Sequence, residues 1–210
     1  MKPKIWMQCV LDAANEMPKY TNELCLLDTK IGDGDHGITI ERGYRSISRE
    51  LQPTDEAVDF CKKYSQIISD NMGGAIGPVY YYFWNSLSAA VKGSEEITAE
   101  VLAQGFEKAA AKIMTACSVK PGDKTVLDAI IPAAQAMAEH RHEPLAQALA
   151  AVVKAADQGR EATLDMVAQK GRAKFLAEKS QGHYDAGAAS FVLWLKELEK
   201  AIKTREMQAE

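Results

Sequence analysis

Apolar residues recur along most of the chain at the spacing of one face of an α-helix. Near the N-terminus, a single helical stripe is formed by Ile5, Trp6, Cys9, Val10 and Ala13. No segment of the sequence alternates β-branched and polar residues with a period of two, as a half-buried strand would. The pattern therefore predicts an all-α protein.

Helix-breaking and capping residues divide this pattern into about eight helices. Thr54 and Thr98 stand where side-chain caps are expected at helix starts, and Asp123 or Thr125 is expected to begin a later helix. Because the connections are short, we expect sequential helices to run antiparallel. Periodicity alone leaves a closed barrel and a stacked bundle both open. We expect one domain over residues 1–210.

Composition and charge narrow the function. Hydrophobic residues make up 47% of the 210 positions and charged residues 26%, which suits one packed core and argues against disorder. The net charge is −4 and no basic run occurs, so a general nucleic-acid binder is excluded. No apolar run approaches the ~20 residues that span a bilayer. Because polar Gln8 comes so early, we expect no signal peptide, no membrane association and a cytoplasmic protein.

Cysteine and histidine, which often bind metals, are scattered in this sequence. No pair of the four cysteines has the two-residue gap of zinc and redox motifs, so we expect reduced and mostly buried thiols. His140 and His142 flank an expected helix end, where partial positive charge suits the helix dipole. Neither residue type predicts a metal site. The aromatic run from Tyr80 to Trp84 is expected to be core.

One polar loop carries more chemistry than the rest of the chain. Asp28, Asp33 and Asp35 lie within eight residues, and the glycines between them let the backbone turn sharply. Magnesium is usually shared between a few carboxylates and substrate phosphates. The start of the following helix adds free N–H groups that favour a nearby anion. The loop therefore predicts a site for phosphate and metal.

Other interpretations of the loop are weaker or excluded. Aspartate and glycine also make ordinary turns and caps, and that interpretation stays open. A calcium EF-hand is excluded, because the sixth position from Asp33 is Ile38 and the twelfth is Tyr44. A Walker phosphate loop is excluded because no Gly-Lys-Ser or Gly-Lys-Thr occurs.

The same loop resembles the signature of a known family. The run from Leu27 to Gly37, followed by Glu41-Arg42-Gly43, is similar to the acidic loop of the L subunits of dihydroxyacetone kinase. Three further segments resemble that family in the same order and together span most of the chain. They are Gly73-Gly74-Ala75-Ile76-Gly77-Pro78, Lys120-Pro121-Gly122-Asp123-Lys124-Thr125, and Lys170-Gly171-Arg172-Ala173 leading to Gly182-His183-Tyr184-Asp185-Ala186-Gly187-Ala188.

The resemblance implies a fold and a set of ligands. The fold would be an antiparallel barrel of eight helices with ADP or ATP bound at one end. Two Mg²⁺ ions would be held against the phosphates by Asp28, Asp33 and Asp35, which are the implied catalytic and metal-binding residues. The implied nucleotide-binding residues are His36, Gly37, Ile38, Thr39, Ala75, Ile76, Cys117, Val126, Arg172, Asp185, Ala186 and Gly187.

Several positions also have simpler interpretations. Arg172 suits a solvated loop cation, and Asp185 suits a cap of the final helix as well as a ligand contact. Asp123 is expected to be a cap rather than a ligand, and Lys124 a surface charge.

The chain departs from the family pattern at three implied site positions. Ile76 stands where the family often has serine, so a hydroxyl contact to phosphate is missing. Thr39 stands where some members have asparagine, and Ala186 replaces a frequent proline. These departures affect the expected nucleotide affinity, while the three carboxylates are intact.

The resemblance implies the phosphoryl-transfer subunit of a dihydroxyacetone or related short-ketose kinase, of the phosphoenolpyruvate–glycerone type. A separate K subunit would hold the ketose, and a phosphohistidine subunit of a phosphotransferase system would recharge bound ADP. Free ATP as donor and a homodimer stay open. The rival hypotheses are a non-catalytic nucleotide sensor that docks a regulator, and a metal-dependent phosphohydrolase. No obvious water-activating base accompanies the acidic loop to support the latter.

Overall fold

The computed structural model describes residues 1–54 and 56–209, and this part of the chain is helical without any strand. The all-α prediction is confirmed. The α-helices are α1 (Pro3–Glu16), α2 (Thr21–Asp28), α3 (His36–Glu50), α4 (Ala57–Asn71), α5 (Ile76–Ala90), α6 (Ala99–Ala116), α7 (Leu127–Glu139), α8 (Leu145–Ala162) and α9 (Ala186–Ala209). Short 3₁₀ helices are η1 (Met17–Tyr20), η2 (Thr163–Asp165) and η3 (Ala173–Ser180).

The described residues form nine α-helices where about eight were expected. Pro18 comes two residues after the end of α1 and lies in the 3₁₀ turn η1. Proline has no backbone N–H and therefore cannot continue the hydrogen-bond ladder of an α-helix. The chain turns there and starts the eight-residue α2. The other eight α-helices are longer and build the body of the fold.

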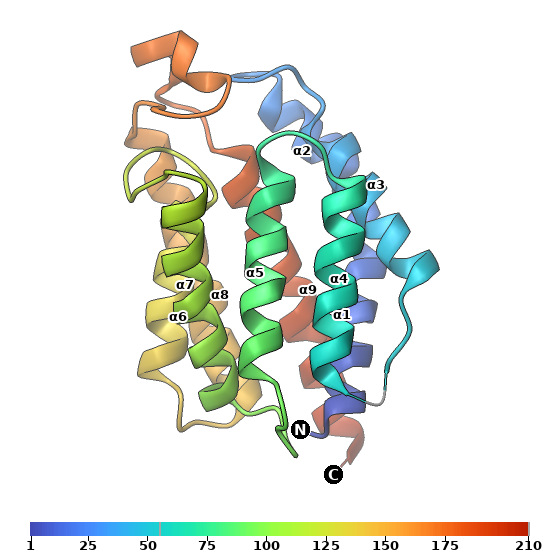
Figure 1. Ribbon diagram of the computed structural model, residues 1–210. Helices are drawn as coiled ribbons and strands as arrows, with labels where there is room; N and C mark the ends of the chain where they lie inside the picture. The colour runs from blue at the N-terminus through green and yellow to red at the C-terminus, as the bar shows by residue number, and fades with distance from the viewer. Residues whose placement is uncertain (55, 210) are drawn as a thin grey trace.

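The long helices form a closed ring. Each helix from α3 to α9 packs against the next along the chain, α9 packs against α1, and α1 packs against α3. Figure 1 shows neighbouring helices running up and down in alternation, with both termini at the lower end. This is the antiparallel arrangement that short connections predict. Ring closure also decides the question that periodicity left open, in favour of a barrel.

Aromatic side chains fill the interior of the barrel. Trp6, Trp84 and Trp194 come from α1, α5 and α9 and are at most 1% exposed. Trp84 stacks on Tyr64 with ring centroids 3.8 Å apart and meets Trp194 edge to face at 5.6 Å. Such pairs stabilise a core beyond the area that they bury. Tyr80, Phe83 and Trp84 of the aromatic run are buried, whereas Tyr81 and Tyr82 are half-buried. The interpretation of the run as core is therefore confirmed for three of its five residues.

Of the expected helix caps, Thr98 and the alternative Thr125 were right, while Thr54 and Asp123 were wrong. Thr125 Oγ1 accepts a hydrogen bond at 3.2 Å from the backbone N–H of Leu127, the first residue of α7. Thr98 Oγ1 accepts a hydrogen bond from Val101 N at 3.3 Å and caps α6 as expected. Thr54 does not cap α4, which starts three residues later, because its hydroxyl donates to Glu56 O at 2.7 Å instead. Asp123 does not start a helix either, because its carboxylate accepts from Lys120 N at 3.0 Å and closes the preceding turn.

Alternation of the helices places every second connection at the same end of the barrel. Residues 29–35, 72–75, 117–126 and 163–185 all lie at the upper end in Figure 1, away from the two termini. These connections contain the four sequence segments that resemble the dihydroxyacetone kinase family. The fold therefore brings together segments that are far apart along the chain.

Two further properties of the described residues bear on the sequence expectations. None of their helices has the length and apolar composition needed to cross a membrane. The four cysteines are all free thiols, with Cys9 and Cys61 buried and Cys25 and Cys117 half-buried.

Candidate functional site

Three carboxylates converge in the loop between α2 and α3. Asp28 is the last residue of α2, and Asp33 and Asp35 follow in the loop. One oxygen from each carboxylate lies within 4.8 Å of the others. Asp28 is half-buried, and the other two are exposed. A set of hard oxygen atoms at this spacing fits a divalent cation such as Mg²⁺.

Asp28 is held in place by the start of α3. Its Oδ2 accepts hydrogen bonds from the backbone N–H groups of Asp35 at 3.1 Å and His36 at 3.3 Å. The carboxylate therefore caps a helix N-terminus and faces the loop at the same time. Gly32 is required by this arrangement, because a Cβ at that position would lie 2.1 Å from Asp28 Oδ1. Gly34 has a φ of +79°, which favours glycine.

His36, the first residue of α3, connects the acidic loop to α9. Its Nε2 lies 3.0 Å from Ser190 Oγ, and that hydroxyl donates to Gly187 O at 2.9 Å. Burial lowers the pKa of His36 to about 4, although the charge of Asp28 opposes this. The ring is therefore neutral at pH 7 and holds the start of α3 against α9.

A cavity of about 530 Å³ lies beside the acidic loop and is lined by all four connections at this end of the barrel. Its size is in the range of small-molecule sites. The predicted site residues that line it are Asp28, Asp33, Asp35, His36, Ile38, Thr39, Ala75, Ile76, Cys117, Val126, Arg172, Asp185, Ala186 and Gly187. The structure thus brings these side chains together, while their roles in binding stay predictions.

Gly37 is the one predicted site residue that does not line the cavity. It is buried behind the loop, where a Cβ would lie 2.0 Å from Thr21 O and 2.8 Å from Cys25 Sγ. Glycine at this position lets α3 approach α2 closely. Gly37 is therefore a packing position that supports the acidic loop, and the approach of its backbone to a phosphate stays a prediction.

Other residues line the cavity that sequence reasoning missed. They are Ile31, Gly32, Arg42, Gly73, Gly74, Val79, Ile113, Val119, Lys124, Thr125, Lys170, Gly171 and Ala173. Helical spacing could have found three of them, since residues four apart share a helix face. Arg42 follows Ile38 by four residues, Val79 follows Ala75 by four, and Ile113 precedes Cys117 by four.

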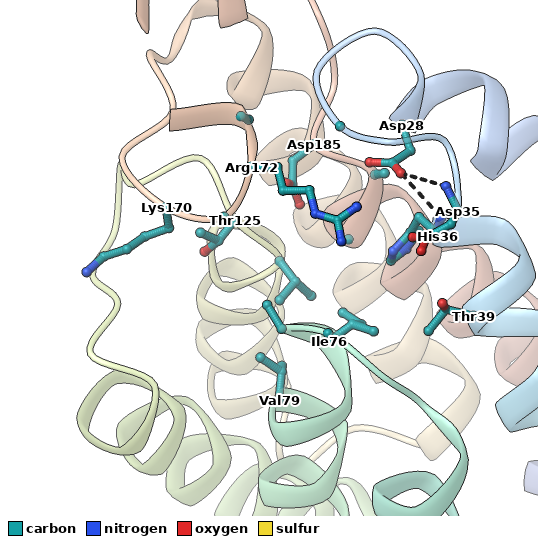
Figure 2. A pocket seen from close by; sticks show the side chains of 18 of the residues that line it. Asp28, Asp35, His36, Thr39, Ile76, Val79, Thr125, Lys170, Arg172 and Asp185 are labelled. Carbon is teal, nitrogen blue, oxygen red and sulfur yellow. Dashed lines mark hydrogen bonds between the residues drawn. The ribbon is translucent and has the colours of Figure 1, made fainter. Parts of the chain in front are cut away.

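The cavity has an apolar side and a charged side. Ile76, Val79, Ile113 and Val126 form a buried apolar wall. Figure 2 shows Ile76 and Val79 below the cavity, with Asp28, Asp35 and Arg172 above them. Such a cavity suits a ligand with a flat apolar group at one end and an anionic, metal-binding group at the other.

Arg172 and Asp185 come from the long connection between α8 and α9. Arg172 forms an ion pair with Asp33, and Figure 2 shows its side chain crossing the cavity towards Asp35 and His36. Asp185 Oδ2 accepts from Ala188 N at 2.7 Å, which confirms it as a cap of α9. Burial raises the pKa of Asp185 to about 7. Since Lys170 also lines the cavity, the connection brings two cations and one carboxyl group to the site.

Lys124 was expected to be a surface charge, and this expectation was wrong. The residue is 2% exposed, and its Nζ donates to the carbonyl oxygens of Thr163, Met166 and His183 at 2.5, 3.2 and 2.6 Å. Its neighbour Asp123 is also 2% exposed, and its carboxylate closes a turn by accepting from Lys120 N rather than capping a helix. The polar sequence around Lys124 gives no local sign of these distant carbonyl groups.

Comparison with known proteins gives the family. The model of the DAK2 domain matches residues 30–200. The chain belongs to the DAK2 family. It is 32% identical over 181 residues to the ADP-binding subunit DhaL of the PEP-dependent dihydroxyacetone kinase of Escherichia coli, covering 84% of this chain and 86% of that one. It is 38% identical over 170 residues to a DhaL subunit of Listeria innocua, with 80% of each chain covered.

Longer relatives in the DAK2 family contain a region like this chain. The L-erythrulose kinase of Pectobacterium atrosepticum is 31% identical, and the match covers 82% of this chain and 30% of that protein. The crystal structure of the dihydroxyacetone kinase of C. freundii superposes with a TM-score of 0.73 at 22% identity. That match covers 96% of this chain and 35% of the other. It shows that the helical fold is shared.

Proposed function

We propose that this member of the DAK2 family is the ADP- and ATP-binding subunit of a kinase for a short ketose such as dihydroxyacetone or erythrulose. One observation carries the proposal: the three carboxylates and the apolar wall lie in the same cavity. A nucleoside diphosphate has complementary parts, because its base is flat and largely apolar and its phosphates bind magnesium. Relatives named as ADP-binding subunits, and others named as kinases of these ketoses, support the same choice.

Asp28, Asp33 and Asp35 would hold two Mg²⁺ ions in this proposal. Their geometry fits, because their oxygen atoms converge within 4.8 Å and Asp28 is already oriented by two backbone N–H groups. Bound Mg²⁺ would neutralise the charge of the phosphates and of the phosphoryl group in transfer. A structural relative has been crystallised with AMP-PNP and Mg²⁺, which agrees with this choice of ligand.

The protein itself would bind the phosphates through helix starts and one cation. The first residues of α3, α5 and α9 line the cavity, and helix N-termini carry free N–H groups and partial positive charge. Arg172 adds a full positive charge above Asp33. We assign phosphate contacts to the backbone around Ile38 and Ala75, and to Arg172. Thr39 offers a hydroxyl on the same side, whereas Ile76 offers none.

The adenine ring would lie against the apolar wall. Cys117 and Val126 border the cavity at the connection between α6 and α7, and Val79 and Ile113 extend the wall by one helical turn each. Burial raises the pKa of the Cys117 thiol, so it stays neutral and acts as a small apolar group. Ala186 and Gly187 would close this side at the start of α9.

The ketose would be held on a partner chain in this proposal. We propose a K-type subunit as the acceptor-binding partner and a phosphohistidine subunit of a phosphotransferase system as the phosphate donor. The relatives matched over most of their length are named as subunits of PEP-dependent kinases, which supports this arrangement. We also propose a cytoplasmic location. Four free thiols agree with a reducing compartment.

A reconstitution tests this function. The purified chain is mixed with a K-type subunit, dihydroxyacetone or erythrulose, and either MgATP or phosphoenolpyruvate with the phosphotransferase proteins. Ketose phosphate should appear only when the chain is present, and native mass spectrometry should show bound ADP with two Mg²⁺ ions. A chain that binds MgADP without supporting phosphorylation from either donor would overturn the kinase proposal in favour of a nucleotide sensor.

A further inference from the structure

The connection between α8 and α9, residues 163–185, forms a long loop whose two ends lie close together; we call this loop the excursion and its two ends the base. Its ends lie side by side, because Gly182 N donates to Leu164 O at 2.8 Å and Asp185 N donates to Thr163 Oγ1 at 3.0 Å. Residues 167–181 leave this base, and we call them the Arg172 segment. Most of the segment is exposed, including Phe175 at 81%. Its position over the cavity is therefore set mainly at its base.

Lys124 holds that base from inside the protein. Its Nζ donates to Thr163 O and Met166 O on the outgoing side, and to His183 O on the returning side. An ammonium group has three N–H donors, and all three are used here. Thr163 stands at the C-terminus of α8, where the helix dipole favours a cation. One side chain thus joins both ends of the excursion.

The conformation of Lys124 is unfavourable in two ways. The residue has a φ of +60°, a region that L side chains rarely adopt, and its ammonium group is shielded from water. Burial lowers the pKa of Lys124, while the nearby charges of Asp185 and Asp165 oppose that change. Both costs are tolerated only where surrounding contacts fix the residue. Those contacts are the three carbonyl groups at the base of the excursion.

The position of Arg172 is the functional consequence of this clamp. Arg172 lies six residues beyond Met166 and forms its ion pair with Asp33 of the acidic loop. Gln169 N also donates to Asp123 O at 3.0 Å. The segment that leads from α8 to Arg172 is therefore hydrogen-bonded to the residue preceding Lys124 as well. The stretch from Met166 to Arg172 is therefore held at one end by Lys124 and at the other end by the ion pair of Arg172 with Asp33.

We propose that Lys124 is a positioning residue for the nucleotide site, which fixes the base of the Arg172 segment and so keeps the Arg172 guanidinium over the acidic loop. The inference rests on the proposed nucleotide-binding function. Lys124 acts through Arg172. The proposal therefore separates Lys124 from two other lysines of the same region, the exposed Lys120 and the half-buried Lys170.

Limited proteolysis tests the clamp without any ligand. Trypsin can cut the Arg172 segment after Lys170, Arg172, Lys174 and Lys179. Lys124→Met should make these cuts at least roughly fivefold faster, because the base of the segment opens more often. Lys120→Met is the matched control, since it removes an exposed lysine of the same loop, and should leave the rate unchanged. Equal rates in both variants would overturn the proposal.

A double-mutant cycle tests the effect on the site. Lys124→Met should weaken MgADP binding about tenfold by calorimetry, the effect expected for losing hydrogen bonds to a charged group. In an Arg172→Ala background the same change should cost less than about twofold, because its route through Arg172 is already gone. Fully additive losses would show direct contact or general damage and would overturn the proposal.

Two further outcomes are informative. Lys124→Gln keeps two N–H donors and should give intermediate proteolysis and binding. If neither Lys124 variant folds, the lysine is needed for the fold as a whole and the proposal fails. If wild-type protein does not bind MgADP, the proposed function fails, and the proteolysis comparison still decides whether Lys124 clamps the segment.

Discussion

Two acidic loops lie at the same end of the barrel and use their carboxylates in opposite ways. In the loop from Asp28 to Asp35, three carboxylates converge and two of them are exposed. In the loop from Lys120 to Asp128, the carboxylates of Asp123 and Asp128 are 2% and 7% exposed. Asp128 accepts from the N–H groups of Gly122 at 2.6 Å and Thr125 at 2.8 Å. The first loop offers charge to a ligand, and the second holds its own backbone.

The difference shows that aspartate and glycine content does not identify a metal site. Both loops are rich in these residues and both precede a helix. What differs is which carboxylates the backbone binds. In the first loop backbone N–H groups bind Asp28, whereas in the second loop they bind both Asp123 and Asp128. Asp33 and Asp35 face the cavity, whereas Asp123 and Asp128 face the turn that they close. The two loops should therefore respond to mutation in opposite ways.

The largest expected effect is on the first loop. Asp35→Asn should weaken Mg²⁺-dependent ADP binding by at least about 100-fold, because it removes one of three charged ligands. The melting temperature without Mg²⁺ should stay level or rise, since three nearby carboxylates repel one another. Calorimetry and thermal unfolding in a chelator measure the two effects. Wild-type affinity in this variant would remove Asp35 from the site.

The second loop should lose stability instead. Asp128→Ala leaves the N–H groups of Gly122 and Thr125 without their acceptor, and should lower the free energy of unfolding by about 3 kcal/mol. Urea unfolding without nucleotide measures this change. A loss below about 0.5 kcal/mol would mean that water replaces the carboxylate and that the loop does not depend on it.

A smaller effect distinguishes the glycines of the two loops. In Gly32→Ala the new Cβ would lie 2.1 Å from Asp28 Oδ1, so the carboxylate must move without any change in charge. Mg²⁺-dependent ADP affinity should fall about tenfold, with little loss of stability. Calorimetry with Mg²⁺ and with chelator measures it, and an unchanged affinity would show that the position of Asp28 is not critical.

Gly122→Ala is the matched change in the other loop. No atom lies within 4 Å of the new Cβ, and the φ of +86° is the only source of strain. The variant should lose about 1 kcal/mol of stability and keep its affinity for MgADP. Weaker MgADP binding would show that the second loop also contributes to the nucleotide site. The distinction between a ligand-binding first loop and a structural second loop would then be wrong.

Much of the fold follows from local sequence signals. Helix positions and the antiparallel order of sequential helices follow from apolar periodicity and short connections, which are properties of neighbouring residues. Closure of the ring depends on contacts between distant helices and was left open by the sequence. The errors came from competing local hydrogen bonds. The Thr54 hydroxyl binds Glu56 O instead of capping α4, and Asp123 closes a turn instead of starting a helix. Both side chains have two available partners, and packing selects between them.

The site was predictable where its residues belong to one motif. The acidic loop carries its own signal, so the convergence of Asp28, Asp33 and Asp35 was expected from sequence. The burial of Lys124 was not expected, because its three acceptors are backbone carbonyls 39 to 59 residues away. Every residue type has a backbone carbonyl, so the sequence does not indicate which ones bind the lysine. The packing role of Gly37 was missed for a similar reason, since its close contact is the backbone of Thr21.

Crystals grown with ADP and Mn²⁺ test the central claim most directly. Manganese takes the same oxygen ligands as magnesium and can be located by its anomalous scattering. We predict two manganese peaks among Asp28, Asp33 and Asp35, with the diphosphate beside them and the base against Val79 and Val126. Manganese bound elsewhere, or ADP bound while the three carboxylates point apart, would contradict the account.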